Sequence, residues 1–430
     1  MGFTVAGISA FYHDSACCVL RDGELICAAE EERFSRIKHD SGLPWRALRF
    51  CLEQAAISIR DLDCLAFYED PQKKLERQIW MGIQPGGQAV LGRALDRLRR
   101  GESVEHRFRE LLGFEGEVEF VDHHHSHAAS AYYFSGYDDS AVLTVDGVGE
   151  WATTAYGSAR GPNIQFFDEV AFPHSLGLLY STITAYLGFE VNEGEYKVMG
   201  LAPYGKPSCV DEMRTLIEAG SGGQFRLQLE YFDFFKGKRM FSDRLPALFG
   251  PPARRPEEEL TSVHCDIARS LQVVLEETLL QQVHYLHTSV PSENLCMAGG
   301  VALNCVANSR ILRDGPFQRI FVQPAAGDSG GALGAAAVAH VRRTREHPGL
   351  RRLRHVYLGP SYSSGQIARL LVGTPANPLD CRGDLEALVE ATVEKLLAGK
   401  VVGWFQGRME FGPRSLGGRS IIGDPRSEKM

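Results

Sequence analysis

The sequence predicts an α/β protein made of two related lobes and a further C-terminal segment. With 430 residues, the chain is too long for one hydrophobic core. Strand-like segments alternate with segments whose apolar residues have helical spacing. Two regions, residues 3–34 and 139–159, open alike with a strand, a polar turn and a further strand. We therefore expect two lobes of similar design.

The first lobe is expected to occupy about residues 1–138. Residues 3–9 alternate as in a strand, and residues 17–34 predict two strands joined at Asp22-Gly23, a hairpin signal. The further elements expected in this lobe are a helix over 44–60 and strands over 62–69 and 117–124.

The second lobe is expected over about residues 139–340. It opens with a strand, an Asp-Gly turn and another strand, and residues 222–258 read as an insertion rich in Phe, Arg and Pro. The later elements are a helix over 261–287, capped by Thr261 or Ser262, and two strand–glycine turn–helix units at 293–304 and 319–341.

A basic run, RRTREHPGLRRLRH at residues 342–355, separates the lobes from the C-terminal piece. It fits a solvated linker or helix end, and an anion-binding role is the alternative. The C-terminal piece contains a helix over 384–400 that closes at Gly399, a strand over 401–407 and a basic, glycine-rich loop.

Composition narrows the class of protein. A net charge of −8 gives no electrostatic footprint for nucleic acid, and no uncharged apolar run approaches the length of a membrane span. The ten cysteines include no CxxC pair, so neither a disulfide framework nor a zinc ribbon is indicated. We expect a cytoplasmic protein with reduced thiols and with no membrane or nucleic-acid partner.

The segment VDHHHSHAAS holds four histidines within five residues. If it is helical, His123 and His127 lie roughly 40° apart around the axis, so that one helix can supply two metal ligands. The glutamate of an HExxH protease is missing, which removes most support for that class. A polar helix start with surface histidines is the alternative reading.

Four further turns carry candidate site residues. Asp328 lies at a strand-to-helix turn, where an ordinary N-cap is the alternative, and Asp146 could equally be the first residue of a hairpin turn. Both follow apolar strands, where ligand sites of α/β proteins form. His13 follows the first strand, and Gly299-Gly300 opens a helix in a turn suited to a nucleotide.

Taken in order, these motifs resemble those of the ATP-dependent O-carbamoyltransferases, which include the tobramycin, cephamycin and nodulation-factor enzymes. The resemblance covers nearly the whole chain and rests on FYHDSA, DHHHSHAASAYY, DGVGEWATT, EYKVMGLAPYG, MAGGVALNC, PAAGDSGGALGAA and GRMEFGPRSLGGRSIIGDPR.

The resemblance implies the two-lobed ATPase fold of actin, Hsp70 and sugar kinases (ASKHA) over residues 1–340. A linker at 341–358 and the start of a YrdC-like domain at 359–430 would follow. In the family, the YrdC-like domain makes carbamoyl-adenylate from carbamoyl phosphate and ATP (with Mg²⁺). The first domain then transfers the carbamoyl group to a hydroxyl of a small molecule, here expected to be a secondary metabolite.

The resemblance also implies roles for single residues. It makes His123, His127 and Asp328 ligands of a divalent metal, expected to be Fe²⁺, with Asp146 beside the metal and His13 near the carbamoyl group. The residues implied at the ATP, adenylate and carbamoyl-phosphate sites are Lys197, Gly299, Gly300, Asn304, Arg408, Arg414 and Arg419.

This sequence departs from the family pattern in the second domain. In the family, that domain runs well beyond the segment that corresponds to DPRSEKM. The YrdC-like part is therefore expected to be only a beginning, and adenylate synthesis by it alone is not expected. Competing readings are a tRNA threonylcarbamoyl-transfer protein, a non-catalytic actin-like nucleotide-binding module and, with less support, a sugar kinase. The acceptor, the metal and a homodimeric state stay open.

Overall fold

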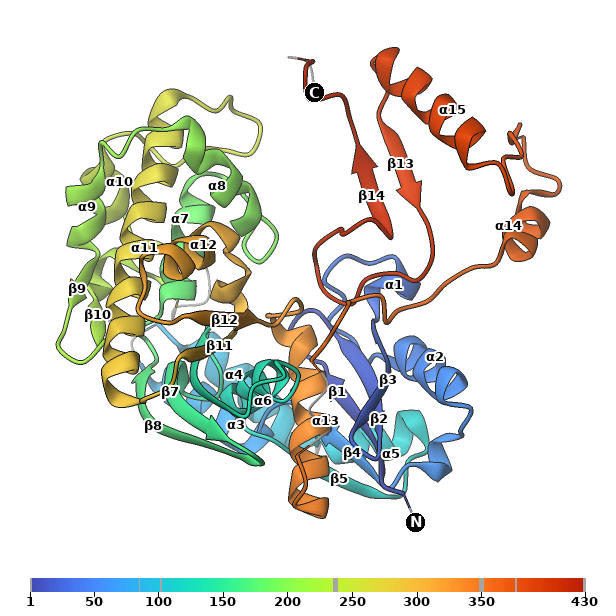
Figure 1. The fold of residues 1–430 in the computed structure, drawn as a ribbon. Coiled ribbons are helices and arrows are strands. Elements are labelled where there is room, and N and C mark those ends of the chain that lie inside the picture. Colours follow the sequence, from blue (N-terminus) through green and yellow to red (C-terminus); the bar gives the residue numbers. More distant parts are fainter. Residues whose placement is uncertain are drawn as a thin grey trace.

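The computed structural model describes residues 2–84, 86–100, 103–234, 239–347, 352–375 and 377–427. Its main body has two five-stranded mixed sheets with helices packed around them (Figure 1). Each sheet supports its own cluster of buried apolar side chains. Two cores agree with the prediction that one would not suffice for a chain of this length.

The first sheet has the strand order β3-β2-β1-β4-β5. Its strands are β1 (Thr4–Ser9), β2 (Ala16–Arg21), β3 (Glu24–Glu30), β4 (Cys64–Phe67) and β5 (Glu117–Phe120). The predicted hairpin is confirmed, because Asp22 and Gly23 join β2 to β3 with φ values of 51° and 75°. Two successive positive φ angles are those of a type I′ turn.

The second sheet has the order β12-β11-β6-β7-β8. Its strands are β6 (Asp139–Val145), β7 (Ala152–Arg160), β8 (Asn163–Ala171), β11 (Asn294–Ala298) and β12 (Arg319–Val322). In both sheets, the central first strand is antiparallel to the next one and parallel to the fourth. The two sheets therefore share one topology, which confirms the predicted two-lobed fold of the actin and sugar-kinase type.

The helices divide between the lobes. The helices of the N-terminal part are α1 (Glu32–Ser35), α2 (Trp45–Ala55), α3 (Pro71–Ile83), α4 (Gln88–Arg100), α5 (Val104–Leu112) and α6 (His123–Tyr132). Those of the second lobe are α7 (Leu176–Tyr186), α8 (Glu195–Leu201), α9 (Val210–Thr215), α10 (Arg244–Phe249), α11 (Ser262–Ser289) and α12 (Cys305–Asp314). Helix α13 (Asp328–Thr344) follows them in the chain, but its buried side chains belong to the first core. The predicted cap of the long helix is confirmed, since Thr261 is the N-cap of α11.

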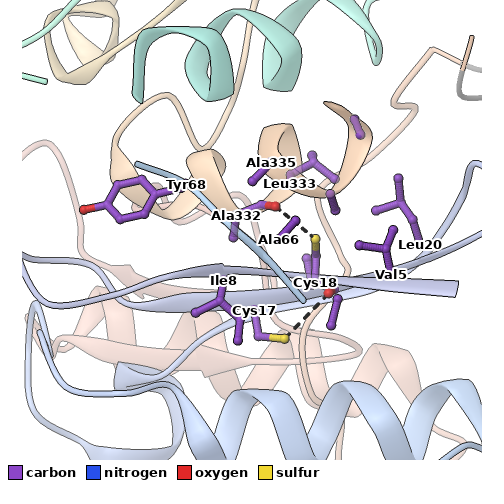
Figure 2. Packing of buried hydrophobic residues seen from close by; sticks show 14 of the residues in the cluster. Val5, Ile8, Cys17, Cys18, Leu20, Ala66, Tyr68, Ala332, Leu333 and Ala335 are labelled. Carbon is purple, nitrogen blue, oxygen red and sulfur yellow. Dashed lines mark hydrogen bonds between the residues drawn. The ribbon is translucent and has the colours of Figure 1, made fainter. Parts of the chain in front are cut away.

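Helix α13 packs closely on both the first sheet and α6. A Cβ on Gly7 would lie 1.9 Å from the carbonyl oxygen of Ala332, and one on Gly334 would lie 1.7 Å from that of Ser126. The thiol of Cys18 donates to the Ala332 carbonyl at 3.4 Å (Figure 2). The small residues of α13 thus allow the approach that fixes its first turn beside α6.

The region predicted as an insertion is part of the second lobe. It contains β10 (Phe225–Leu227), which pairs with β9 (Ile217–Ala219), and then α10. The buried side chains of Phe225, Phe232 and Leu245 anchor this region in the second core.

The helices and strands of the C-terminal segment project away from both lobes (Figure 1), whereas Leu358 and Phe411 of this segment are buried in the first core. The segment comprises α14 (Ser364–Leu371), α15 (Leu385–Leu397) and a two-stranded sheet of β13 (Val402–Phe405) and β14 (Arg419–Ile422). Neither helix buries a residue. Part of the predicted linker, residues 348–351, lies outside the described residues, and the proposed domain boundaries stay predictions. None of the described helices is both long and apolar enough to cross a lipid bilayer.

Candidate active site and metal centre

Helix α6 begins directly after β5 and places two histidines on one buried face. His123 and His127 lie one turn apart, are 2% and 0% exposed, and have their Nε2 atoms 3.0 Å from each other. The helix required by the sequence argument is present, and these two histidines are not surface residues. Two imidazole nitrogens therefore converge on one point inside the protein.

Two carboxylates reach the same point from other elements. Asp146 follows β6, and its Oδ2 lies 2.8 Å from Nε2 of His123 and 3.4 Å from Nε2 of His127. Asp328 opens α13, and its Oδ1 lies 3.8 Å from both Nε2 atoms. The N-cap of α13 is Gly327, so Asp328 is not an ordinary capping residue. Because β7 starts only at Ala152, Asp146 does not sit in a tight two-residue hairpin either.

These four side chains form a buried donor set that could hold a metal ion. One ligand atom from each of His123, His127, Asp146 and Asp328 lies within 4.8 Å of all the others. Two carboxylates so close together in a buried place need compensating positive charge. Imidazole and carboxylate donors together suit Fe, Zn and similar divalent cations. The residues present therefore fit a divalent metal.

The protonation of the cluster agrees with this interpretation. Burial and the neighbouring His127 lower the pKa of His123 to about 3, so this ring is neutral and keeps a lone pair. Although burial opposes it, hydrogen bonds from both histidines hold the pKa of Asp146 well below its usual range. Burial raises the pKa of Asp328 to about 6. Burial lowers the pKa of His127, but the hydrogen bond and charge of Asp146 outweigh it and raise that pKa, so a metal ion would take the place of a proton on this ring.

The glycine turn predicted to receive a nucleotide adjoins this cluster. The backbone N–H of Gly300 donates to Oδ1 of Asp146 at 2.8 Å. Gly299 has a φ of 96°, and a Cβ there would lie 2.2 Å from the carbonyl oxygen of Val145. Glycine is therefore required for the chain to turn so close to the end of β6.

Two supporting residues were not predicted from the sequence. The hydroxyl of Tyr68, just after β4, donates to Oδ2 of Asp328 at 3.1 Å, and its ring is buried (Figure 2). The carboxylate of Glu150 accepts the backbone N–H of His123 at 2.9 Å and so anchors the start of α6. The available signal for Tyr68 was its position after a strand, the same position that led to His13 and Asp146.

His13 lies at the edge of the cluster, with its Nε2 4.0 Å from Oδ2 of Asp328. Its Nδ1 lies 2.9 Å from Asp14, whose other oxygen lies 2.6 Å from Nδ1 of His39. Burial lowers the pKa of His13, but the charges of Asp328 and Asp14 outweigh it and raise that pKa to about 9. Asp14 thus fixes the ring so that Nε2 faces the cluster.

A cavity of about 480 Å³ opens beside the cluster. Its wall includes five of the residues predicted for the site: His13, Asp146, Gly300, Asn304 and Arg414. The side chain of Asn304 also caps α12, and Arg414 donates to the Leu303 carbonyl at 2.7 Å. Arg414 therefore connects the C-terminal segment to the cavity of the main body.

The structure does not bring the other predicted site residues to this cavity. Lys197 is exposed on α8, with its Nζ 5.8 Å from the ring centre of Tyr196. Arg408 donates to the carbonyls of Leu358 and Gly359. Arg419 pairs with Glu410 at 3.3 Å. Arg408 faces a separate hollow, which the C-terminal segment forms with His355 and Tyr357.

The fold and the cluster define a two-lobed α/β protein with a candidate metal centre beside an interlobe cavity. Comparison with known families then places the chain. Residues 4–337 match the carbamoyltransferase N-terminus family and residues 393–430 match the carbamoyltransferase C-terminus family. The chain therefore belongs to the carbamoyltransferase family, as the motifs predicted.

Two relatives and one solved structure illustrate the similarity. The uncharacterized protein sll1178 of Synechocystis is 44% identical over 99% of this chain and 72% of its own length. Nodulation protein NolNO of Sinorhizobium fredii is 37% identical over 97% of this chain, which spans 59% of that relative. The crystal structure of T. kodakarensis HypF is 12% identical, with a TM-score of 0.39 over 79% of this chain and 48% of its own.

Proposed function

We propose that this protein is the carbamoyl-transfer part of an O-carbamoyltransferase. It would move a carbamoyl group from carbamoyl-adenylate to a hydroxyl of a small-molecule acceptor, a secondary metabolite, in the cytoplasm. The observation that carries the proposal is the buried cluster of His123, His127, Asp146 and Asp328 beside His13 at a cavity. Membership of the carbamoyltransferase family agrees with it.

Each residue of the site would have its own role in the carbamoyl transfer. The hydroxyl oxygen forms a bond to the carbamoyl carbon, while the bond from that carbon to the adenylate phosphate breaks and AMP leaves. His13 is held through Nδ1 by Asp14, and once a bound cation compensates Asp328 and lowers the pKa of His13, this ring would take the hydroxyl proton at Nε2. A divalent cation bound by His123, His127 and Asp328 would polarise the carbamoyl oxygen as a Lewis acid. Its positive charge would compensate the negative charge of the adenylate phosphate. Asp146, fixed by Gly300, would keep both imidazoles in place.

The nucleotide would lie against the turn of Gly299 and Gly300 near Asn304. We propose ATP, as its Mg²⁺ complex, and carbamoyl phosphate as the source of the adenylate. Its synthesis would belong to a YrdC-like domain that begins near residue 359, after a linker at 341–358 and a transfer domain at 1–340. Arg408, Arg414 and Arg419 are proposed for the phosphate groups of that reaction.

We propose Fe²⁺ as the metal. Two histidines and a carboxylate on one side of a site form the donor set typical of non-haem Fe²⁺. Here His123 and His127 supply the nitrogens from a single helix, and Asp328 supplies the oxygen from α13.

The proposal is tested by incubating the purified protein with ATP, carbamoyl phosphate, Fe²⁺ and a panel of hydroxyl metabolites. A parallel reaction supplies carbamoyl-adenylate made by a separate enzyme, so that transfer is measured apart from synthesis. The expected result is an acceptor with the mass gain of one carbamoyl group in at least the second reaction. No carbamoylated product in either reaction would contradict the proposal.

A further inference from the structure

The part of the cavity lined by α3 contains a buried cation that has no carboxylate partner among the described residues. Arg77 lines the cavity and is 7% exposed, although it is an arginine on a helix next to solvent-facing residues. Its Nε is buried without a hydrogen-bond partner, and no carboxylate of the described residues lies within ion-pair distance of it. Burying a guanidinium in this way is costly unless an anion compensates it.

The acidic residues near Arg77 already have partners of their own. Both oxygens of Glu69 lie 2.7 Å from Nζ of Lys74. The carboxylate of Glu150 accepts the backbone N–H groups of Asp70 and His123. Neither Glu69 nor Glu150 is therefore free to pair with Arg77. The positive charge of Arg77 remains available to an anion that enters the cavity.

The surroundings of Arg77 are apolar. Its guanidinium carbon lies 5.7 Å from the ring centre of Phe172, a cation–π contact with another residue of the cavity wall. Met81, one turn further along α3, and Val90 of α4 line the same cavity. A guanidinium group surrounded by apolar side chains suits a ligand that has one oxyanion and is otherwise apolar.

We infer that this end of the cavity binds the acceptor, and that the acceptor carries an oxyanion, such as a carboxylate, held by Arg77. Its apolar part lies against Met81, Val90 and Phe172. This assignment of the acceptor class rests on the proposed carbamoyl transfer, but the anion site itself does not. Arg77 belongs to α3, whereas the proposed nucleotide turn at Gly299-Gly300 follows β11, so different elements supply these two parts of the cavity wall.

The test is a binding experiment on the full chain that needs neither ATP nor carbamoyl phosphate. Three hydroxylated carboxylic acids, with aliphatic, aromatic and fused-ring bodies, are compared with their primary amides by calorimetry. At least one acid is expected to bind about tenfold or more tightly than its amide, the effect of one charge-assisted hydrogen bond. Arg77→Gln abolishes that preference, and Arg77→Lys keeps part of it.

Arg49→Gln is the matched control, because Arg49 is an exposed arginine on α2 and 69% accessible. It leaves the acid preference unchanged. Inorganic phosphate and AMP are titrated into the same variants to separate an acceptor anion from a phosphate of the donor. If Arg77→Gln weakens phosphate or AMP binding and spares the acid–amide difference, Arg77 serves the donor and the inference is overturned.

Equal binding of every acid and its amide to the unaltered protein also overturns the inference, and this outcome does not depend on any variant folding. Arg77→Lys, which keeps the charge, covers the case in which Arg77→Gln is unstable. Absence of carbamoyl transfer in the activity assay, with the acid preference intact, would instead contradict the proposed function and leave the anion site in place.

Discussion

The Nε2 atoms of His123 and His127 lie 3.0 Å apart on consecutive turns of α6, and the Nδ1 atoms of both rings are buried without a partner among the described residues. Two imidazoles in this position either share a proton or face a common cation. The carboxylates of Asp146 and Asp328 beside them favour the cation.

We expect His127→Ala to abolish carbamoyl transfer and to reduce metal affinity by more than about 100-fold, because loss of even an indirect supporting partner costs 10–100-fold. Metal content by mass spectrometry and circular dichroism of the same sample check this. His125→Ala is the control, since His125 lies on the same helix and contacts the ring of Phe166 instead of the cluster. Equal metal content and turnover in His127→Ala would contradict the assignment.

Tyr68→Phe removes the hydrogen bond to Asp328 and keeps the buried ring. Metal affinity should fall by about 10–100-fold, because that hydroxyl orients a ligand, while the fold remains intact. Competitive metal titration against a chelator measures the change. Tyr132→Phe, which loses a hydroxyl bonded to the Asp138 carbonyl away from the cluster, should bind metal as the unaltered protein does. An unchanged affinity in Tyr68→Phe would show that Asp328 needs no such support.

Removal of the metal should change the titration of His13. Burial lowers the pKa of His13, but the carboxylates of Asp328 and Asp14 outweigh it and raise that pKa to about 9, above the ordinary 6.5. In the metal-free protein, the stability that this group contributes is full below pH 6.5 and is lost as the pH rises through about 9. A bound cation compensates Asp328, so the pKa should fall and metal binding should release protons.

Nuclear magnetic resonance of the His13 ring protons across the pH range, with and without Zn²⁺, measures this difference. His13→Asn identifies the signal, and His106, an exposed histidine on α5, serves as the internal reference. A His13 pKa that does not change with Zn²⁺ would mean that the ion binds elsewhere.

Gly334→Ala should destabilise the protein by at least about 1–3 kcal/mol, because the new methyl group would meet the carbonyl oxygen of Ser126 in a close-packed helix contact. Urea unfolding measures the free energy of unfolding. Gly92→Ala on α4, where a Cβ meets no atom within 4 Å, should be neutral or slightly stabilising. Equal unfolding midpoints of the two variants would contradict the packing described for α6 and α13.

Much of the fold was predictable because its signals are local. The Asp22-Gly23 hairpin, the cap at Thr261 and the spacing of His123 and His127 depend on neighbours within a few residues along the chain. The position of Asp146 after a buried strand was also a local signal, and the strand order explains why it meets the histidines.

The parts that sequence reasoning missed depend on contacts between distant segments. Tyr68 and Asp328 are 260 residues apart, and nothing near either one indicates the other. Arg77 has no carboxylate partner among the described residues because Glu69 pairs with Lys74 and Glu150 accepts the backbone N–H of His123. No local pattern in the sequence indicates these pairings. The arginines of the C-terminal loop looked alike in the sequence, yet Arg414 alone among the three predicted ones lines the main cavity.

The shared strand order of the two sheets also bears on how the site is composed. β1 and β6 hold corresponding places in their sheets, so the turns that carry His13 and Asp146 are topological counterparts. One half places an imidazole at that position and the other half places a carboxylate. Exchanging His13 and Asp146 would leave the site with the same two side chains, but the imidazole would then come from the second lobe and the carboxylate from the first.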